Sequence, residues 1–324
     1  MTALLGGAFL AACGPGEVGD GGGSAPPAGS LSVHVLDVGQ GDATLIVGSD
    51  GTSVLFDGGP RQAADVVAAA IETYADGRLD AVMLSHTDAD HLGGLVGVLR
   101  GADGVAGTAD DRMPARRLIG HDDAACTTQV CDEFRLLRAF PFDEPAVGEE
   151  ISLGDATLTV VARDGRAGGG EAAGVDEENE RSLAITLTHA GKTIFIGGDL
   201  TGGGLGSADV EGMLAADLGP IDVVHLDHHG SATSSSDVFL AATRPRAMIV
   251  SVGTDNAYCH PDAGVLTRVG ALDVPLYATG SGMVADGARC DGATSWPETA
   301  REGLGTFTIV VDAAGTITIA GDPL

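Results

Sequence analysis

Four predicted β-strands in this chain each end in Asp or His residues that lie next to glycine. These strand ends carry Asp57, residues 86–91, Asp199, and the pair His228 and His229. In α/β folds, loops at strand ends build functional sites because the sheet fixes the root of each loop. A neighbouring glycine lets the backbone approach a ligand closely. The pattern predicts an α/β fold with one site assembled from four strand ends.

The run His86-Thr87-Asp88-Ala89-Asp90-His91 is the most informative of these strand ends. It supplies four potential metal ligands directly after the apolar residues 81–84. Carboxylates and imidazoles this close repel one another and lose hydration unless a cation lies among them. The alternative is an acidic surface loop with two solvated histidines. The other three strand ends favour a metal site.

Short apolar runs alternate with helical patterns along the chain, which is typical of an α/β protein. Strands are expected at residues 31–35, 43–47, 53–56, 80–84, 157–161, 183–188, 193–196, 221–226, 247–252 and 274–277, and a hairpin is expected from 306–311 with 316–319. Helices are expected around residues 66–74, 92–99, 237–242 and 265–269. Residues 101–145 are loop-rich and are interpreted as an insertion in a single domain that spans residues 31–324.

The N-terminus resembles a bacterial lipoprotein signal. Residues 2–12 are small and apolar and are followed by Cys13, which predicts a signal peptide over residues 1–12 and lipidation of Cys13. No Lys or Arg precedes the apolar run, which favours a true start codon further upstream. Residues 13–30 are rich in Gly, Pro and Ser and predict a flexible tether. The expected location is the cell envelope, with a lipid anchor as the only membrane contact, or the periplasm or extracellular space.

The remaining cysteines are even in number, which suits an oxidising compartment. Cys126 and Cys131 are close enough to close a small loop, which would pair Cys259 with Cys290. Three pairings are formally possible, and four unpaired thiols are the alternative.

The charge of the chain is strongly negative. It has 17 Lys and Arg against 46 Asp and Glu, a formal net charge of −29. An acidic surface does not attract polyanions at long range. Any contact with nucleic acid therefore has to depend on bound metal or on local arginines such as Arg112, Arg116 and Arg117.

The ordered motifs resemble the metallo-β-lactamase superfamily, and within it the hydrolase domain of ComEC/Rec2 DNA-uptake proteins. The matching segments are residues 36–42 (LDVGQGD), 56–59 (FDGG), 84–94 (LSHTDADHLGG), Asn179 with Ser182 and Leu183, 198–199 (GD), 228–231 (HHGS) and 256–261 (NAYCHP). The resemblance covers roughly residues 31–280 and implies a four-layer αββα sandwich. The chain lacks the long apolar spans of the channel that accompanies this domain in DNA-uptake proteins, which favours a free-standing, tethered version.

The resemblance implies a site for two divalent metal ions. His86 and Asp88 match the first-metal ligands; Asp90, His91 and His228 match the second; Asp199 matches the carboxylate that bridges both. Asp57 and Asn179 would support these ligands from behind. Asp88 stands where many members of the superfamily have His, and this harder donor favours Mn²⁺ alongside Zn²⁺, the expected metal. Cys259 replaces the usual Gly before His260.

The expected reaction is hydrolysis of a phosphodiester, with DNA as one candidate substrate and the monomer as the expected state. Two neighbouring cations lower the pKa of a bridging water to roughly 7, so that it ionises to hydroxide, and they hold the phosphate oxygens. Asp90, His229 and His260 are the predicted catalytic residues, and Ser231 and Asn256 are predicted to contact substrate.

Two other classes of function stay open. One is hydrolysis of another ester class, by a phosphorylcholine-esterase-like or lactamase-like enzyme. Asn179 and Ser182 stand where lactamases have a further histidine, which counts against a lactamase. The other is a non-catalytic DNA-binding module, which the complete ligand set of the second metal disfavours.

Overall fold

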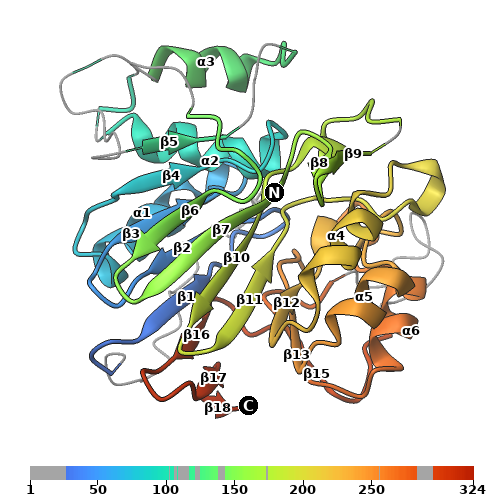
Figure 1. Cartoon of the computed structure of the whole chain (residues 1–324). Helices are drawn as coiled ribbons and strands as arrows, with labels where there is room; N and C mark the ends of the chain where they lie inside the picture. The colour runs from blue at the N-terminus through green and yellow to red at the C-terminus, as the bar shows by residue number, and fades with distance from the viewer. Residues whose placement is uncertain are drawn as a thin grey trace, which may run out of the picture.

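The computed structural model describes residues 27–101, 103–105, 108, 117–120, 125–137, 143–172, 174–254, 256–282 and 295–324. The predictions for the signal peptide, for Cys13, for most of the tether and for Cys290 lie outside the described residues. The described residues form two β-sheets that face each other, with helices on both outer sides (Figure 1). Within this part of the chain, no helix combines the length and apolar character needed to cross a bilayer.

The first sheet has the strand order β18-β17-β16-β1-β2-β3-β4-β5. Its strands are β1 (Leu31–Val35), β2 (Thr44–Val47), β3 (Ser53–Phe56), β4 (Ala81–Met83), β5 (Arg117–Ile119), β16 (Phe307–Val311), β17 (Ile317–Ile319) and β18 (Asp322–Pro323). Neighbours are antiparallel from β18 to β3, whereas β3, β4 and β5 run parallel. The carboxyl ends of β3 and β4 therefore lie side by side.

The second sheet has the order β15-β14-β13-β12-β11-β10-β7-β8-β9, with β6 paired to β7. Its strands are β6 (Glu150–Leu153), β7 (Ala156–Arg163), β8 (Arg166–Ala167), β9 (Gly170–Glu171), β10 (Ala184–His189), β11 (Lys192–Ile196), β12 (Val223–His225), β13 (Ala247–Val250), β14 (Leu276–Ala278) and β15 (Ala300–Arg301). Strands β11 to β15 are parallel, so their carboxyl ends share one edge of the sheet.

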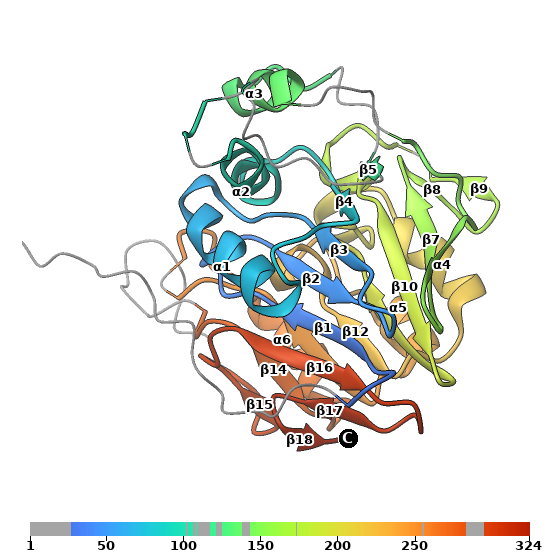
Figure 2. The same cartoon turned by 90° about the vertical axis from the view of Figure 1, so that its left-hand side faces the viewer.

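Three hydrophobic layers hold the sandwich together. Alternate residues such as Val33 and Ile185 form the layer between the sheets. The opposite face of the first sheet packs on α1 (Ala64–Tyr74), α2 (Ala89–Leu99) and α3 (Gln129–Leu137). The outer face of the second sheet packs on α4 (Val210–Leu218), α5 (Asp237–Thr243) and α6 (Ala263–Gly270). Figure 2 shows α1 and α2 on one side of the paired sheets and α4 to α6 on the other. The predicted four-layer αββα sandwich is confirmed.

Several elements differ from the sequence-based expectation. The segment interpreted as a loop-rich insertion contributes β5, which extends the first sheet next to β4, and α3, which packs on α2. Residues 117–119 lie in a segment that was interpreted as loop-rich, so the sequence did not distinguish them as a strand. Helix α2 begins at Ala89, not near residue 92, which places Asp90 and His91 in its first turn.

Disulfide bonding agrees in part with the predicted pairs. Cys126 and Cys131 form a disulfide with a Cα–Cα distance of 6.2 Å, and Cys131 lies in α3. Cys259 is also disulfide-bonded.

Candidate metal centre

The four predicted strand ends meet at one edge of the sandwich. Asp57 follows β3 and His86 follows β4 in the first sheet, while Asp199 follows β11 and His228 follows β12 in the second. Backbone hydrogen bonds join these ends, including Leu183 N–H to Ser85 O at 2.9 Å between the sheets and His228 N–H to Gly198 O at 3.0 Å within the second. The alignment of parallel strands is what gathers residues that are distant in sequence.

Asp199 lies at the centre of the cluster and is 3% exposed. Its Oδ1 atom is 3.2 Å from His91 Nε2 and 3.5 Å from His229 Nε2. Its Oδ2 atom is 3.5 Å from His228 Nε2 and 3.9 Å from His86 Nε2. The four imidazole rings thus divide into two pairs, one at each carboxylate oxygen.

Two further carboxylates complete two distinct groups. Asp90 Oδ2 lies 3.5 Å from His229 Nε2, and Asp88 Oδ2 lies 3.6 Å from His86 Nε2. We call the first group the enclosed position; it consists of Asp90, His91, His229 and Asp199 Oδ1. We call the second group the open position; it consists of His86, Asp88, His228 and Asp199 Oδ2.

His228 lies in the open group, which differs from the sequence-based assignment of this residue to the second metal. It is His229 that lies beside Asp90 and His91. The two adjacent residues have left-handed backbones, with φ of 51° and 54°, inside the short helix η4 (Asp227–Gly230). Their rings diverge, with an angle of 71° between the ring planes. Adjacent histidines in a sequence give no indication of which one points to which oxygen.

Hydrogen bonds fix His91 so that its Nε2 lone pair faces the enclosed position. His91 Nδ1 donates to Asp57 Oδ2 at 2.8 Å, and Ser85 Oγ donates to the same oxygen at 2.6 Å. Ser85 N–H donates to Asp57 Oδ1 at 2.7 Å. Asp57 therefore lies beneath the cluster, where the resemblance placed it.

The same logic applies to His86 and His229. Because the Ser85 hydroxyl donates to Asp57, it accepts from His86 Nδ1 at 2.9 Å. His229 Nδ1 donates to Ser251 O at 3.0 Å. Because Nδ1 of each ring is engaged in these hydrogen bonds, Nε2 is the nitrogen that would bind a cation in place of a proton.

The donor set fits a divalent metal. The Nε2 atoms of His86, His91 and His229 and Oδ1 of Asp199 are buried and lack a hydrogen-bond partner. Burial disfavours the charged form of His229, yet Asp199 and Asp42 raise its pKa to about 9. The field at the enclosed position therefore favours positive charge, and imidazole and carboxylate are donors that Zn²⁺ and Mn²⁺ accept.

Close backbone contact brings the Asp57 loop against helix α2. A Cβ atom on Gly94 would lie 1.8 Å from Gly58 O, and one on Gly58 would lie 2.5 Å from Leu95 N. Only glycine permits this approach. Gly58 and Gly94 thus explain why glycine adjoins both ligand-bearing segments.

The remaining predicted residues support neighbouring loops. Asn179 Nδ2 lies 3.2 Å from His228 Nε2, beside the open position. Ser231 Oγ accepts from Thr233 N–H and Oγ1 at 3.3 and 3.0 Å. Asn256 Nδ2 donates to Gly253 O and His260 O, while its Oδ1 accepts from His260 N–H. Asn256 therefore holds the His260 loop in place through these hydrogen bonds.

His260 lies above the histidine cluster. Its ring centroid is 5.6 Å from that of His228 and 6.3 Å from that of His229. Burial, with further contributions from His229 and His228, lowers the pKa of His260 to about 4, so the ring is neutral at pH 7. Cys259 has a φ of 64°, a conformation that favours glycine and matches the glycine of the related motif.

Sequence reasoning missed Asp42, which it quoted only as part of a motif. One ligand atom from each of Asp42, His91, Asp199 and His229 lies within 4.8 Å of the others. The apolar residues around Asp42 and its neighbouring Gly41 were the available signal, because they predict a buried carboxylate at the end of a strand pair.

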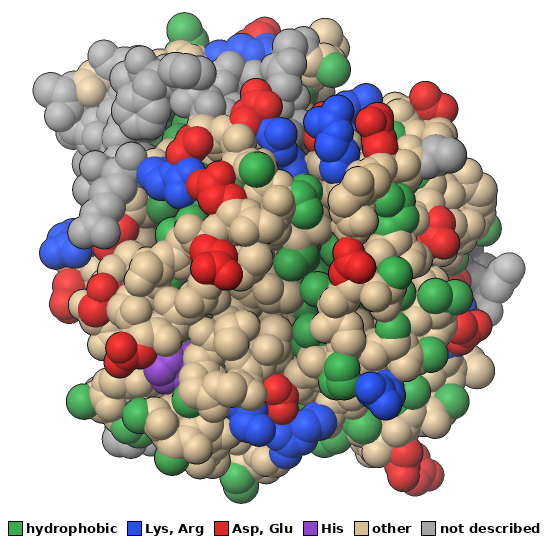
Figure 3. All heavy atoms as spheres, in the orientation of Figure 1, with side chains coloured by type: hydrophobic (Ala, Val, Ile, Leu, Met, Phe, Trp, Pro, Cys, Tyr) green, Lys and Arg blue, Asp and Glu red, His purple; other side chains and the backbone are tan. Residues whose placement is uncertain are grey.

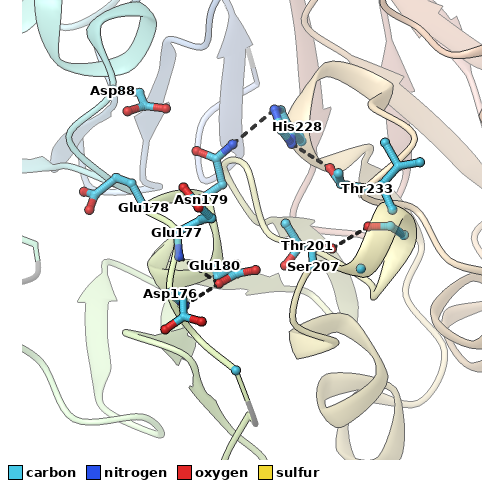
Figure 4. Close-up of a pocket in the computed structure, with 14 residues that line it drawn as sticks. Asp88, Asp176, Glu177, Glu178, Asn179, Glu180, Thr201, Ser207, His228 and Thr233 are labelled. Atoms are coloured by element: carbon cyan, nitrogen blue, oxygen red, sulfur yellow. Dashed lines mark hydrogen bonds between the residues drawn. The ribbon is translucent and has the colours of Figure 1, made fainter.

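A cavity of about 510 Å³ opens beside the open position (Figure 4). Asp88, Asn179 and His228 line one side of it, at the top of the view in Figure 4. Its walls come from the acidic loop before β10 and from the loop after β11, and the lining residues are Asp88, Gly174, Asp176, Glu177, Glu178, Asn179, Glu180, Thr201, Gly204, Leu205, Gly206, Ser207, His228 and Thr233. None of them is Lys or Arg, so the cavity is acidic.

Basic side chains elsewhere are mostly paired with carboxylates. Arg117 contacts Asp143 and lies 2.8 Å from Glu149, while Arg112 and Arg116 lie outside the described residues. On the face seen in Figure 3, Lys and Arg side chains lie in small groups close to Asp and Glu side chains. That face offers no broad basic surface to nucleic acid among the residues described.

Comparisons with known proteins match most of the chain to one family. The family model described as the metallo-beta-lactamase superfamily matches residues 36–254. Competence protein ComA from Neisseria gonorrhoeae is 29% identical over 262 residues, which cover 79% of this chain and 32% of that protein. Recombination protein 2 from Haemophilus influenzae is 29% identical over 241 residues, covering 73% of this chain and 26% of that protein.

The chain spans about a third or less of the length of these curated relatives. Among solved structures, the metallo-beta-lactamase fold protein YhfI from Bacillus subtilis is 14% identical, with a TM-score of 0.45, over 79% of this chain and 99% of that one.

Proposed function

The chain belongs to the metallo-β-lactamase superfamily, and on that premise we propose that it is a metal-dependent phosphodiesterase. The observation that supports this most directly is the division of four imidazole Nε2 atoms between the two oxygens of Asp199. A carboxylate shared by two cation positions is the arrangement of two-metal hydrolytic centres. His91, His229 and Asp90 would hold one ion, and His86, His228 and Asp88 the other.

Two divalent ions held there would lower the pKa of water and withdraw charge from the phosphate oxygens. The residues of the chain prepare this chemistry. Asp57 orients His91, and Ser85 links Asp57 to His86, so both rings are set before substrate arrives. The side chain of Asp88 is 50% exposed and faces the cavity, so a phosphate would reach the centre from the side of the open position.

Nucleic acid is the substrate class suggested by the relatives, which are named for competence and recombination. We extend the proposal to DNA outside the cytoplasm, on the strength of the lipoprotein-like N-terminus. The acidic cavity and the paired arginines favour short or single-stranded diesters over long duplexes, because these place fewer phosphates near carboxylates.

The test is hydrolysis of bis-p-nitrophenyl phosphate, single-stranded DNA and duplex DNA by the purified protein with Zn²⁺ or Mn²⁺. We expect turnover of at least the small diester, and loss of more than about 100-fold in Asp199→Ala, because Asp199 touches both positions. A β-lactam and a carboxylic ester serve as controls. A wild-type protein that binds metal yet hydrolyses no phosphodiester would contradict the proposal, and DNA retention by that protein would favour the binding-module alternative.

A further inference from the structure

Asp42 carries a buried carboxylate that no described side chain neutralises by a hydrogen bond. The residue is 3% exposed, and neither Oδ1 nor Oδ2 has a hydrogen-bond partner. An ionised carboxylate away from water is strongly unfavourable unless a donor or a cation compensates it. Its position therefore calls for a partner of positive charge.

The two nearest histidines direct their ring nitrogens elsewhere. His225 Nε2 is 3.5 Å from Asp42 Oδ1, but it accepts the Ser251 N–H at 3.2 Å. His229 Nδ1 is 3.8 Å from Asp42 Oδ2, and it donates to Ser251 O at 3.0 Å. Ser251 thus occupies the nitrogens that face Asp42, and neither histidine supplies the missing hydrogen.

The backbone holds Asp42 firmly against the enclosed position. Asp42 N–H donates to Asp90 O at 3.2 Å, and Gly59 N–H donates to Asp42 O at 2.7 Å. Gly41 has a φ of 136°, and a Cβ there would lie 2.3 Å from Asp90 O. A larger residue at position 41 would push Asp42 away from the segment that carries Asp90 and His91.

We propose that Asp42 is a further ligand of the cation at the enclosed position. It shares a cluster with His91, Asp199 and His229 in which the ligand atoms lie within 4.8 Å of one another. A cation there would satisfy the carboxylate of Asp42 together with the Nε2 atoms of His91 and His229, which also lack a hydrogen-bond partner. The inference rests on the proposed metal centre, but not on the identity of its substrate.

Asp42 changes the charge and hardness of the centre. With Asp88, Asp90 and Asp199 it provides four carboxylates, whose charge equals that of two divalent ions. The enclosed position then has three carboxylates and two imidazoles, and such an oxygen-rich set raises affinity for Mn²⁺ relative to Zn²⁺. Removal of Asp42 should therefore weaken Mn²⁺ binding more than Zn²⁺ binding.

The experiment compares Asp42→Asn with wild type and with Asp37→Asn, an exposed control on the same loop. Each full-length protein is stripped of metal, and Mn²⁺ and Zn²⁺ affinities are measured by calorimetric titration alongside melting temperature. We expect Asp42→Asn to raise the Mn²⁺ dissociation constant of the tighter site by at least about tenfold. Its metal-free form should melt no lower than wild type, because the substitution removes an uncompensated charge, and the gain in melting temperature on adding Mn²⁺ should shrink.

An unchanged Mn²⁺ affinity in Asp42→Asn would overturn the inference. A lower melting temperature of the metal-free variant with unchanged affinity would also overturn it, because that result indicates a structural role. If Asp42→Asn does not fold, Asp42→Glu keeps the charge on a longer side chain and should retain Mn²⁺ binding better than Asp42→Ser. Wild-type protein that binds both ions and cleaves no phosphodiester would contradict the proposed function alone.

Discussion

The enclosed and open positions share Asp199 but have very different surroundings. At the enclosed position both imidazoles are buried, with the side chains of His91 and His229 0% and 2% exposed, and only Asp90 is partly exposed, at 32%. At the open position His86 is fully buried, but the side chains of His228 and Asp88 are 19% and 50% exposed. The first is fixed by buried hydrogen bonds to Asp57 and Ser251, while the second adjoins the acidic cavity.

This difference predicts unequal roles for the two ions. Ligands that are buried and already oriented bind a cation tightly, because their side chains lose little conformational entropy on binding. Partly exposed ligands allow exchange with solvent and entry of substrate. We expect the enclosed ion to remain through purification and the open one to be readily lost.

The largest expected effect comes from replacing each of the two adjacent histidines in turn with alanine. His229→Ala should lose the tightly held ion, whereas His228→Ala should keep about one ion per chain after dialysis, because His228 lies at the open position. Elemental analysis after dialysis measures both, with activity expected to fall by more than about 100-fold in His229→Ala. Equal metal content in the two variants would break the distinction between the positions.

A smaller effect is expected from Ser85, whose hydroxyl connects Asp57, the partner of His91, to His86. Ser85→Ala removes the acceptor for His86 Nδ1 and one donor to Asp57, but no ligand. Metal affinity should fall by about tenfold, the lower end of the range for such supporting residues. Ser182→Ala is the control, since among the described residues the Ser182 hydroxyl accepts from the backbone N–H of Asp199, at 3.3 Å, and from no imidazole ring. An equal loss in both variants would mean that Ser85 acts only through general packing.

Outside the centre, His34 shows what burial does without a carboxylate nearby. Burial lowers the pKa of His34 to about 4, from an ordinary value of 6.5, whereas carboxylates raise that of His229. Between pH 6.5 and about pH 4, His34 takes up a proton in the unfolded chain but not in the folded protein. The free energy of unfolding therefore falls as the pH decreases through this window. From pH 7 to pH 5 the loss should be about 2 kcal/mol.

Urea unfolding of metal-free protein at pH 7 and pH 5 tests this prediction. His34→Gln should lack this part of the pH dependence, although it loses the stacking of His34 on Tyr74, at 3.9 Å between centroids. The relevant quantity is the change between the two pH values in each protein. An identical change in both proteins would show that His34 does not contribute.

The smallest effect concerns the acidic cavity. Asp176→Asn with Glu177→Gln removes two exposed negative charges from its wall. Cleavage of a trinucleotide should improve by about threefold relative to bis-p-nitrophenyl phosphate, since exposed charges interact weakly through water. The gain should vanish at high salt. A gain that persists in salt would point to shape and not charge.

Much of the fold followed from local patterns in the chain. Alternating apolar residues at β1 and helical spacing in α1 are signals that depend only on sequence neighbours, and both elements formed as expected. Helix α4 escaped prediction because its apolar residues do not gather on one face, and β5 because it lies in a segment that was interpreted as loop-rich. Their stability comes from packing and pairing with distant segments.

By itself the sequence determined most of the chemical groups that reach the centre. Asp57, His86, Asp199 and His229 each follow a strand, and the apolar pattern of that strand shows where it ends. Only the tertiary structure decided which oxygen of Asp199 each histidine faces, and that Asp42 joins the cluster. The reason is physical: ring direction depends on the left-handed backbone at His228 and His229 and on hydrogen bonds to Asp57 and Ser251. The position of Asp42 depends on contact between Gly41 and the Asp90 backbone, which forms only when the two loops pack together.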